Sequence, residues 1–142
     1  MKKIIVKGSG GHGVKLLMLL LANFLAKDKK ISLVFDYDSA VRGGYINGNM
    51  ILSDHPIASP IITEGDIVID MNDNKLQNED QEKQIDLAVV KKDFASLRAN
   101  MFYFGVLLNL LSLELNKEKV QKIMGNKFSE ENWRSMEMGF AS

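Results

Sequence analysis

The chain has 142 residues, enough for one domain with a hydrophobic core, and its apolar fraction of 46% is ordinary for a globular protein. Eighteen basic residues balance eighteen acidic ones, so the chain lacks the positive excess with which nucleic-acid binders neutralise phosphates. The absence of cysteine excludes disulfides, thiolate metal sites and cysteine-held iron–sulfur clusters.

The N-terminal apolar run is too short for targeting. "MKKIIVKGSGG" has only three apolar residues before Lys7, too few for a signal peptide. The apolar segment that follows is interrupted by Asn23 and Lys27, so it does not predict a membrane span. We therefore expect a cytoplasmic protein that binds neither membrane nor nucleic acid.

The first elements form a strand–helix–strand pattern. "KIIVKG" (residues 3–8) is a β-branched run that ends at glycine and predicts a buried strand. Residues 14–30 predict a helix with lysines gathered at its end, and "ISLVFDYD" (31–38) predicts a second strand. A glycine turn joins the first strand to the helix, so the pattern indicates a βαβ unit with a right-handed crossover and a parallel sheet.

The middle of the chain mixes strands and connections. "YINGNMILSD" (45–54) predicts a strand with an Asn-Gly bend or bulge, and "HPIASPII" (55–62) an extended, proline-marked connection. "GDIVIDM" (65–71) predicts another buried strand. The polar residues 72–84 predict a surface loop, and "IDLAVV" (85–90) a further short strand.

From Leu97 onward the apolar period becomes helical, over residues 97–115, 116–128 and 129–141. Asn116 is the expected N-cap of the second of these helices, and Ser129 opens the third, where two glutamates suit the helix N-terminus. The whole pattern predicts a single α/β domain, residues 1–142, with a helical C-terminal third.

A glycine-rich loop follows the first strand. A helix start carries unpaired N–H groups, and glycines let a ligand approach that backbone, so the loop predicts an anion site for phosphate or carboxylate. The spacing contains the G-x-G-x-x-G pattern. The loop residues are Gly8, Gly10, Gly11, His12 and Gly13.

Other interpretations of this loop remain open. A nicotinamide or flavin site needs an acidic residue at the end of the second strand, where Asp36 and Asp38 stand. ATP hydrolysis is disfavoured because Val14 and Lys15 follow the loop in place of the Lys-Ser/Thr pair of NTPases. A glycine turn needed only for tight strand-to-helix packing is the remaining interpretation.

A second candidate group follows the second strand. Arg42 is followed by Gly43 and Gly44, so its positive charge lies next to flexible backbone without side chains. The guanidinium fork matches the geometry of a carboxylate or a phosphate. The alternative is that Arg42 holds its own loop through a surface ion pair. In a parallel sheet both loops would lie beyond the C-terminal strand ends, where ligands bind.

Several segments, in order, resemble one family. "GSGGHGV" (8–14), "RGG" (42–44), "SDHPIASPII" (53–62) and "GDIVID" (65–70) are similar to the gamma subunit of the 2-oxoacid:ferredoxin oxidoreductases, which act on pyruvate, 2-oxoglutarate, 2-oxoisovalerate or indolepyruvate. "NMFYFG" and "NWRSMEMGF" resemble two helices of the same subunit, in which an Asn precedes a Gly.

The resemblance implies a Rossmann-like, three-layer α/β domain with a mostly parallel sheet. It implies one subunit of an enzyme, inactive alone, in a complex that decarboxylates a 2-oxoacid and passes electrons to ferredoxin and the acyl group to coenzyme A. Thiamine diphosphate and iron–sulfur clusters would belong to partner subunits. Coenzyme A is the ligand implied for the two glycine loops, with Arg42 beside its phosphate or a carboxylate.

The chain departs from the family pattern at three places. His12 stands where glutamine is usual, Ala40 stands where glutamate is usual and a Gly-Pro pair is missing, and the stretch between the 65–71 segment and Leu97 is short. The alternative function is a free-standing nucleotide-binding module that no longer belongs to an oxidoreductase complex.

Overall fold

The computed structural model describes residues 1–38, 44–59 and 64–142. The chain forms two compact units, Met1–Ile85 and Asp86–Ser142, and each is described by itself. Between them they make a mixed α/β fold, as expected. The single domain of residues 1–142 remains a prediction. Among the described residues, no helix is long and apolar enough to cross a membrane.

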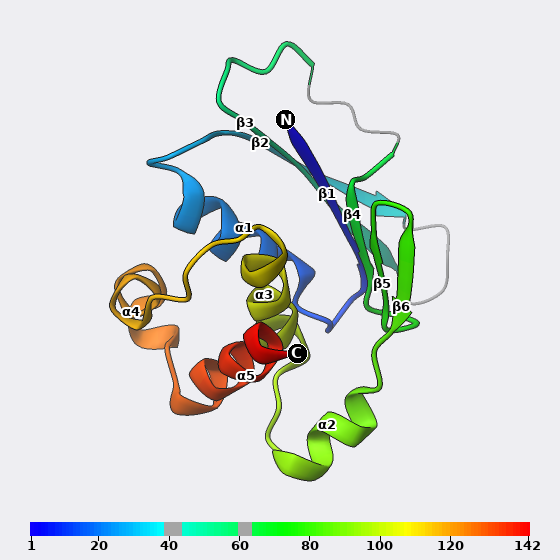
Figure 1. Cartoon of the computed structure of the whole chain (residues 1–142), viewed down its shortest axis with the longest axis vertical. Coiled ribbons are helices and arrows are strands. Elements are labelled where there is room, and N and C mark those ends of the chain that lie inside the picture. Colours follow the sequence, from blue (N-terminus) through cyan, green and yellow to red (C-terminus); the bar gives the residue numbers. More distant parts are fainter. Residues whose placement is uncertain (39–43, 60–63) are drawn as a thin grey trace. The chain divides into compact units, whose positions relative to one another are not determined.

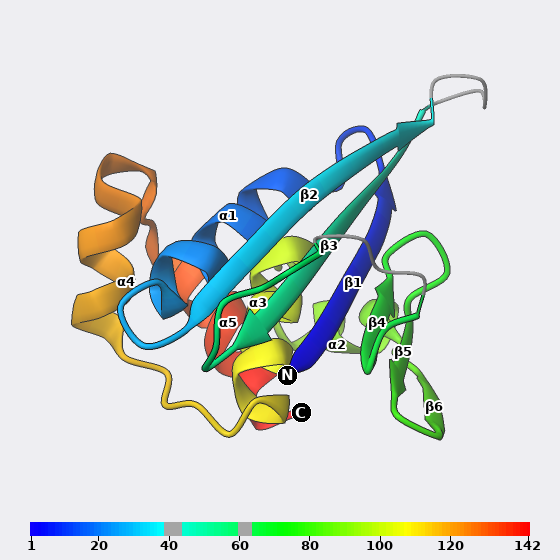
Figure 2. The same ribbon diagram turned by 90° about the horizontal axis from the view of Figure 1, so that it is seen from above.

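The first unit is a six-stranded sheet with one helix. Figure 2 shows the strands side by side in the order β2-β3-β1-β4-β5-β6, and α1 lies against one face of β1, β2 and β3. The core between them is made of side chains such as Ile4, Val6, Leu17, Met18 and Met50, all fully buried. The elements are β1 (Lys2–Ser9), α1 (Val14–Leu25), β2 (Lys30–Asp38), β3 (Tyr45–Ser53), β4 (Ile67–Asp70), β5 (Lys75–Asn78) and β6 (Gln81–Gln84).

The strand–helix–strand pattern is present, but the mostly parallel sheet was a wrong prediction. β2 does run parallel to β1, yet β3 lies between them and is antiparallel to both. Among the described strands, β1 and β4 form the one parallel pair, with Ile4 opposite Ile67. The reason is that residues 45–53 return as a hairpin partner of β2 and take the place beside β1. The three-layer arrangement remains a prediction.

β3 is a regular strand without the predicted bulge. Its register is continuous from Tyr45 to Leu52 with β1 and from Tyr45 to Ser53 with β2. Gly48 has a packing role instead, because a Cβ there would lie 2.6 Å from Cγ of Met18, where α1 meets the strand. The Asn-Gly pair therefore marks a close helix-to-strand approach.

The polar stretch after β4 is a β-hairpin, where a surface loop was predicted. β5 pairs antiparallel with β4, and β6 pairs antiparallel with β5. Glu79 follows β5 in the turn with a φ of 56°, a conformation that a non-glycine residue seldom adopts. The four side chains of β6 are all exposed, which explains why the sequence shows no alternation there.

The second unit is helical, as predicted (Figure 1). Residues 85–90 were predicted as a strand, but Leu87–Asp93 forms helix α2, whose N-cap Asp86 accepts a hydrogen bond from the Val89 amide. The predicted caps Asn116 and Ser129 both accept hydrogen bonds from the amide three residues on. The helices are α2, α3 (Ala99–Leu110), α4 (Lys117–Met124) and α5 (Glu130–Ala141), with a 3₁₀ turn at Gly125–Lys127.

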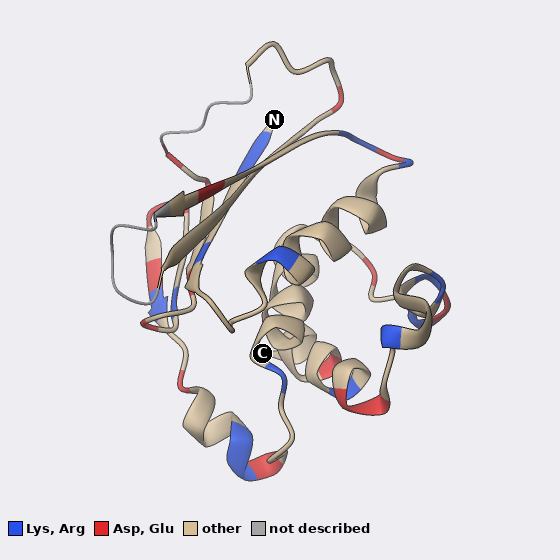
Figure 3. Ribbon diagram, turned by 180° about the vertical axis from the view of Figure 1, so that it is seen from behind, with Lys and Arg blue, Asp and Glu red and all other residues tan. Residues whose placement is uncertain are grey.

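α3 and α5 cross at two glycines. α3 carries no charged residue (Figure 3), and residues 101–108 are all buried. A Cβ at Gly105 would lie 2.1 Å from the Met136 carbonyl oxygen, and one at Gly139 would lie 1.8 Å from that of Phe102. Asn109 Nδ2 also donates to the Phe140 carbonyl at 2.7 Å. The two helices therefore approach backbone to backbone.

Candidate functional site

The glycine loop lies between the end of β1 and the start of α1. Gly8 is buried in β1, and a Cβ there would lie 2.5 Å from Val14 Cγ2 in the first turn of the helix. Gly8 is therefore required for tight strand-to-helix packing. To this extent the packing interpretation of the loop is correct.

His12 folds back onto the loop. Its Nδ1 accepts a hydrogen bond from the Ser9 amide at 3.0 Å, and its own amide donates to the Ser9 carbonyl at 3.1 Å. The two bonds close the segment from Ser9 to His12 into a turn. His12 thus fixes the shape of a loop whose other residues are mostly glycines.

The outer part of the loop is open. Gly10 and Gly11 are exposed, and nothing lies within 4 Å of a Cβ built at Gly11. Gly13 is the N-cap of α1 in the left-handed region, at φ 73°, and no side chain caps the helix there. The first turn of α1 holds no acidic residue, and Lys15 is exposed. A helix start with no acidic residue in its first turn and no side-chain cap suits an anion.

A second loop joins the site, and the sequence did not reveal it. Ser9 Oγ donates to Asn72 Oδ1 at 2.6 Å, which ties the glycine loop to the segment after β4. Asp70 Oδ1 accepts from the amides of Asn72 and Asp73 and so shapes that segment. Because β1 and β4 are parallel neighbours, these two loops leave the sheet at the same end, where both strands finish.

β3 also starts at this end of the sheet, after the connection from β2. Tyr45 is opposite Ser9 in the β1–β3 register, and Gly44, at φ 64°, directly precedes it. Of the second candidate group, Arg42 and Gly43 lie outside the described residues, as does Ala40.

The place of β2 in the sheet does not suit a dinucleotide site. Asp36 Oδ2 accepts from Asn49 Nδ2 at 2.9 Å, on β3. β3 separates β2 from β1, whereas a ribose-binding carboxylate normally follows the strand beside the glycine loop. The geometry therefore gives no support to the nicotinamide or flavin interpretation.

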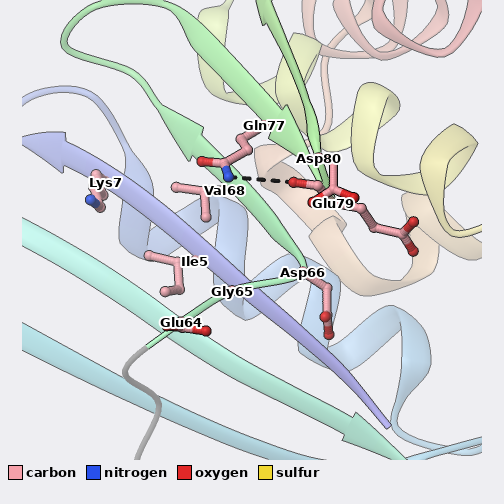
Figure 4. Close-up of a pocket in the computed structure, with 9 residues that line it drawn as sticks. All are labelled: Ile5, Lys7, Glu64, Gly65, Asp66, Val68, Gln77, Glu79 and Asp80. Carbon is pink, nitrogen blue, oxygen red and sulfur yellow. Dashed lines mark hydrogen bonds between the residues drawn. The ribbon is translucent and has the colours of Figure 1, made fainter.

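An open hollow lies near β1, β4 and β5. Figure 4 shows Lys7 at one end and Glu79 with Asp80 at the other, and Gln77 Nε2 donates to the Glu79 carbonyl at 3.4 Å. Four carboxylates outnumber one lysine, so the hollow disfavours phosphate, unlike the glycine loop. Its lining residues are Ile5, Lys7, Glu64, Gly65, Asp66, Val68, Gln77, Glu79 and Asp80. Among the described residues, no group of three His, Asp or Glu side chains could hold a metal ion.

The model of the pyruvate ferredoxin/flavodoxin oxidoreductase family matches residues 3–92, more than half of the chain, and the chain belongs to that family of oxidoreductases. The resemblance found in the sequence is thereby confirmed. No curated protein matches the chain by sequence.

Solved structures show the same fold. The gamma subunit of a keto/oxoacid ferredoxin oxidoreductase from Geobacter sulfurreducens is 20% identical, with a TM-score of 0.67 over 99% of this chain and 97% of that one. Pyruvate oxidoreductase subunit PORC from Thermotoga maritima is 16% identical, with a TM-score of 0.70 over 100% and 97%. The 2-oxoglutarate:ferredoxin oxidoreductase from Magnetococcus marinus is 18% identical, with a TM-score of 0.73, but the match covers 99% of this chain and 31% of that one.

Proposed function

We propose that the chain is the gamma subunit of a 2-oxoacid:ferredoxin (or other acceptor) oxidoreductase in the cytoplasm. The observation that carries the proposal is the family match over residues 3–92. The fold supports it, because it is similar over almost the whole chain to oxidoreductase subunits that are chains of about the same length. The subunit is inactive alone. Thiamine diphosphate and the iron–sulfur clusters reside in partner subunits, and ferredoxin meets the complex rather than this chain.

The glycine loop holds a phosphate of coenzyme A in this proposal. The bare, exposed backbone at Gly10 and Gly11, and a helix start without acidic residues, suit such an anion. The solved structure of the Magnetococcus marinus enzyme has 2-oxoglutarate, coenzyme A and succinyl-CoA bound. Coenzyme A is therefore a ligand of an enzyme to which this chain is similar. Coenzyme A supplies the thiol that accepts the acyl group.

The chain's own residues bind and orient the ligand. Gly8 and His12 hold the loop in shape, Gly10 and Gly11 present exposed backbone to the ligand, and Gly13 is the residue at which the helix starts. Gly44 lies at the same end of the sheet, because the next residue, Tyr45, is paired with Ser9. Arg42 and Gly43 complete the proposed set, with the guanidinium as partner of a phosphate or carboxylate.

The experiment that tests the subunit role is affinity purification of the tagged chain from its native host at low salt. Mass spectrometry identifies the chains that accompany it. Recovery of a thiamine-diphosphate-dependent subunit is the expected result, and the assembly then oxidises a 2-oxoacid in a coenzyme A-dependent assay. A chain that purifies alone overturns the proposal in favour of a free-standing nucleotide-binding module.

The ligand is tested separately by calorimetric titration of the recovered assembly with coenzyme A. Gly11→Ala fills the open side of the loop, and its matched control is Gly125→Ala. Both glycines have positive φ and open space around the added methyl group, but Gly125 lies outside the loop, after α4. Weaker binding in the first variant alone supports the site; equal binding in both overturns it.

A further inference from the structure

The two edges of the six-stranded sheet differ. β6 has four residues, all exposed and polar, whereas β2 has nine and contains no proline. Figure 2 shows β2 at the outer edge, and within the described residues it pairs with a strand on one side only, β3. Natural edge strands are usually short, charged or interrupted, because an open row of N–H and C=O groups recruits another strand. β6 is short and polar, as this rule expects, whereas β2 is long and uninterrupted, with charged residues only at Lys30, Asp36 and Asp38.

β2 is apolar yet poorly covered. None of the side chains at positions 30–37 is buried, and Val34 is 38% exposed. On the neighbouring strand, by contrast, residues 48–53 are all buried. Ile31, Leu33 and Phe35 alternate along β2, so they share the face of the sheet on which α1 packs at Gly48, opposite Phe35. A further strand beside β2 would cover these three side chains.

The charges of β2 fit a second copy of the same strand. In a twofold antiparallel pair centred on Leu33, Lys30 of each copy lies opposite Asp36 of the other, and Ile31 lies opposite Phe35. Lys30 and Asp36 are both exposed. Asp36 Oδ2 accepts a hydrogen bond from Asn49 Nδ2 on β3, which holds one carboxylate oxygen in place and does not involve Oδ1. Oppositely charged pairs stand at both ends, and Leu33 meets its own copy at the centre.

We propose that two copies of this chain associate through β2, antiparallel and centred on Leu33, so that the two sheets become one. The surface is isologous and closes after two copies, so the pairing ends at a dimer. The inference is independent of the proposed ligand.

Charge reversal on the full-length chain tests the pairing and its register. Lys30→Glu places a second carboxylate opposite Asp36 at both ends of the pair, and Asp36→Lys places a second ammonium group opposite Lys30 at both ends. Each single variant is expected to weaken the dimer about tenfold, since two symmetric cross-strand pairs turn repulsive. The double variant, K30E/D36K, restores opposite charges and is expected to bring the dissociation constant back toward that of the original chain. Sedimentation velocity over a concentration series measures each constant.

Lys83→Glu, on the other edge of the sheet, is the matched control and is expected to leave the dimer unchanged. Circular dichroism checks that each variant folds. If a variant does not fold, amide hydrogen exchange on the unaltered chain still decides the question. Protection of β2 amides must then rise with protein concentration while that of β6 stays constant. A monomer at every concentration, single variants that dimerise normally, or a double variant without recovery would overturn the proposal.

Discussion

Ser9 and Asn72 join the two loops that follow the parallel strands β1 and β4, through a hydrogen bond of 2.6 Å between Ser9 Oγ and Asn72 Oδ1. The contact lies beside the open backbone of Gly10 and Gly11. Its residues are 63 positions apart in sequence, so the bond ties the glycine loop to a segment from a distant part of the chain.

Removal of this tie is expected to act on binding more than on stability. Ser9→Ala loses an exposed hydrogen bond worth about 1 kcal/mol, so the affinity for coenzyme A should fall about fivefold. Ser9→Thr keeps the hydroxyl and should bind normally. Titration calorimetry measures both. Equal affinity in all three proteins would mean that the tie does not shape the site.

Gly8→Ala is expected to disturb the strand-to-helix junction. Its methyl group would lie 2.5 Å from Val14 Cγ2, and such overpacking costs about 1–3 kcal/mol. Urea unfolding should record that loss. The same experiment on Gly11→Ala should show only the backbone cost of a left-handed alanine, about 1 kcal/mol, because the space there is empty.

His12→Gln is expected to preserve the loop. Glutamine offers an amide oxygen that can accept from the Ser9 amide in place of Nδ1. His12→Ala leaves that amide without its partner and should cost about 1 kcal/mol in the free energy of unfolding. Chemical denaturation distinguishes the two. A glutamine variant as unstable as the alanine variant would show that the ring is required for another reason.

Gly139→Ala is expected to separate α3 from α5. The added methyl group would meet the Phe102 carbonyl oxygen at 1.8 Å, and because that atom is backbone, a whole helix must move. We expect a loss of about 3 kcal/mol or more in stability. Ala141→Gly, on an exposed position of the same helix, should cost no more than about 1 kcal/mol. Thermal unfolding provides the comparison.

Asp54 should give a small, pH-dependent contribution to stability. Lys29 Nζ lies 2.6 Å from its Oδ1, and that hydrogen bond, followed by the charge of Lys29, lowers the pKa of Asp54. A lowered pKa in the folded state stabilises the protein above the unfolded-state pKa, and the contribution is lost as pH falls through the folded-state pKa.

Asp54→Asn should therefore be less stable than the original chain near neutral pH, and the difference should close in acid. Melting temperatures across the pH range measure it. The matching variant Lys29→Met should reproduce the neutral-pH difference. A gap that widens as pH falls would contradict this account. Since Asp54 is exposed, salt should also reduce the gap.

Local patterns predicted several elements well. β1, β2, β3 and β4 lie where apolar runs and glycines indicated, and the caps Asn116 and Ser129 are as expected. α1 starts at Val14 as predicted but ends at Leu25, before the lysines that were expected in its last turn. The order of strands was not predictable in this way. Whether β2 or β3 lies beside β1 depends on contacts between residues distant in sequence, which the local pattern of either strand does not record.

Two elements were misread for identifiable reasons. "LAVV" within residues 87–90 is a short apolar run that fits a strand or a helix equally, and the deciding signal was Asp86 as N-cap, with Lys91 and Lys92 in the last turn. The β5–β6 hairpin has polar side chains on both faces, so no alternation marks it. In the site, Asn72 carried no motif, and only the parallel pairing of β1 with β4 brings it to Ser9.

The central place of β1 has a consequence for synthesis on the ribosome. Its two neighbours, β3 and β4, are both made later, and the pairing is complete only when Asp70 has been added opposite Lys7. Until then Ile4, Ile5 and Val6 belong to a strand without its full set of partners. Translation proceeds at about 5–20 residues per second, so β1 waits for several seconds in the nascent chain. During that interval the segment is a natural target for a ribosome-associated chaperone.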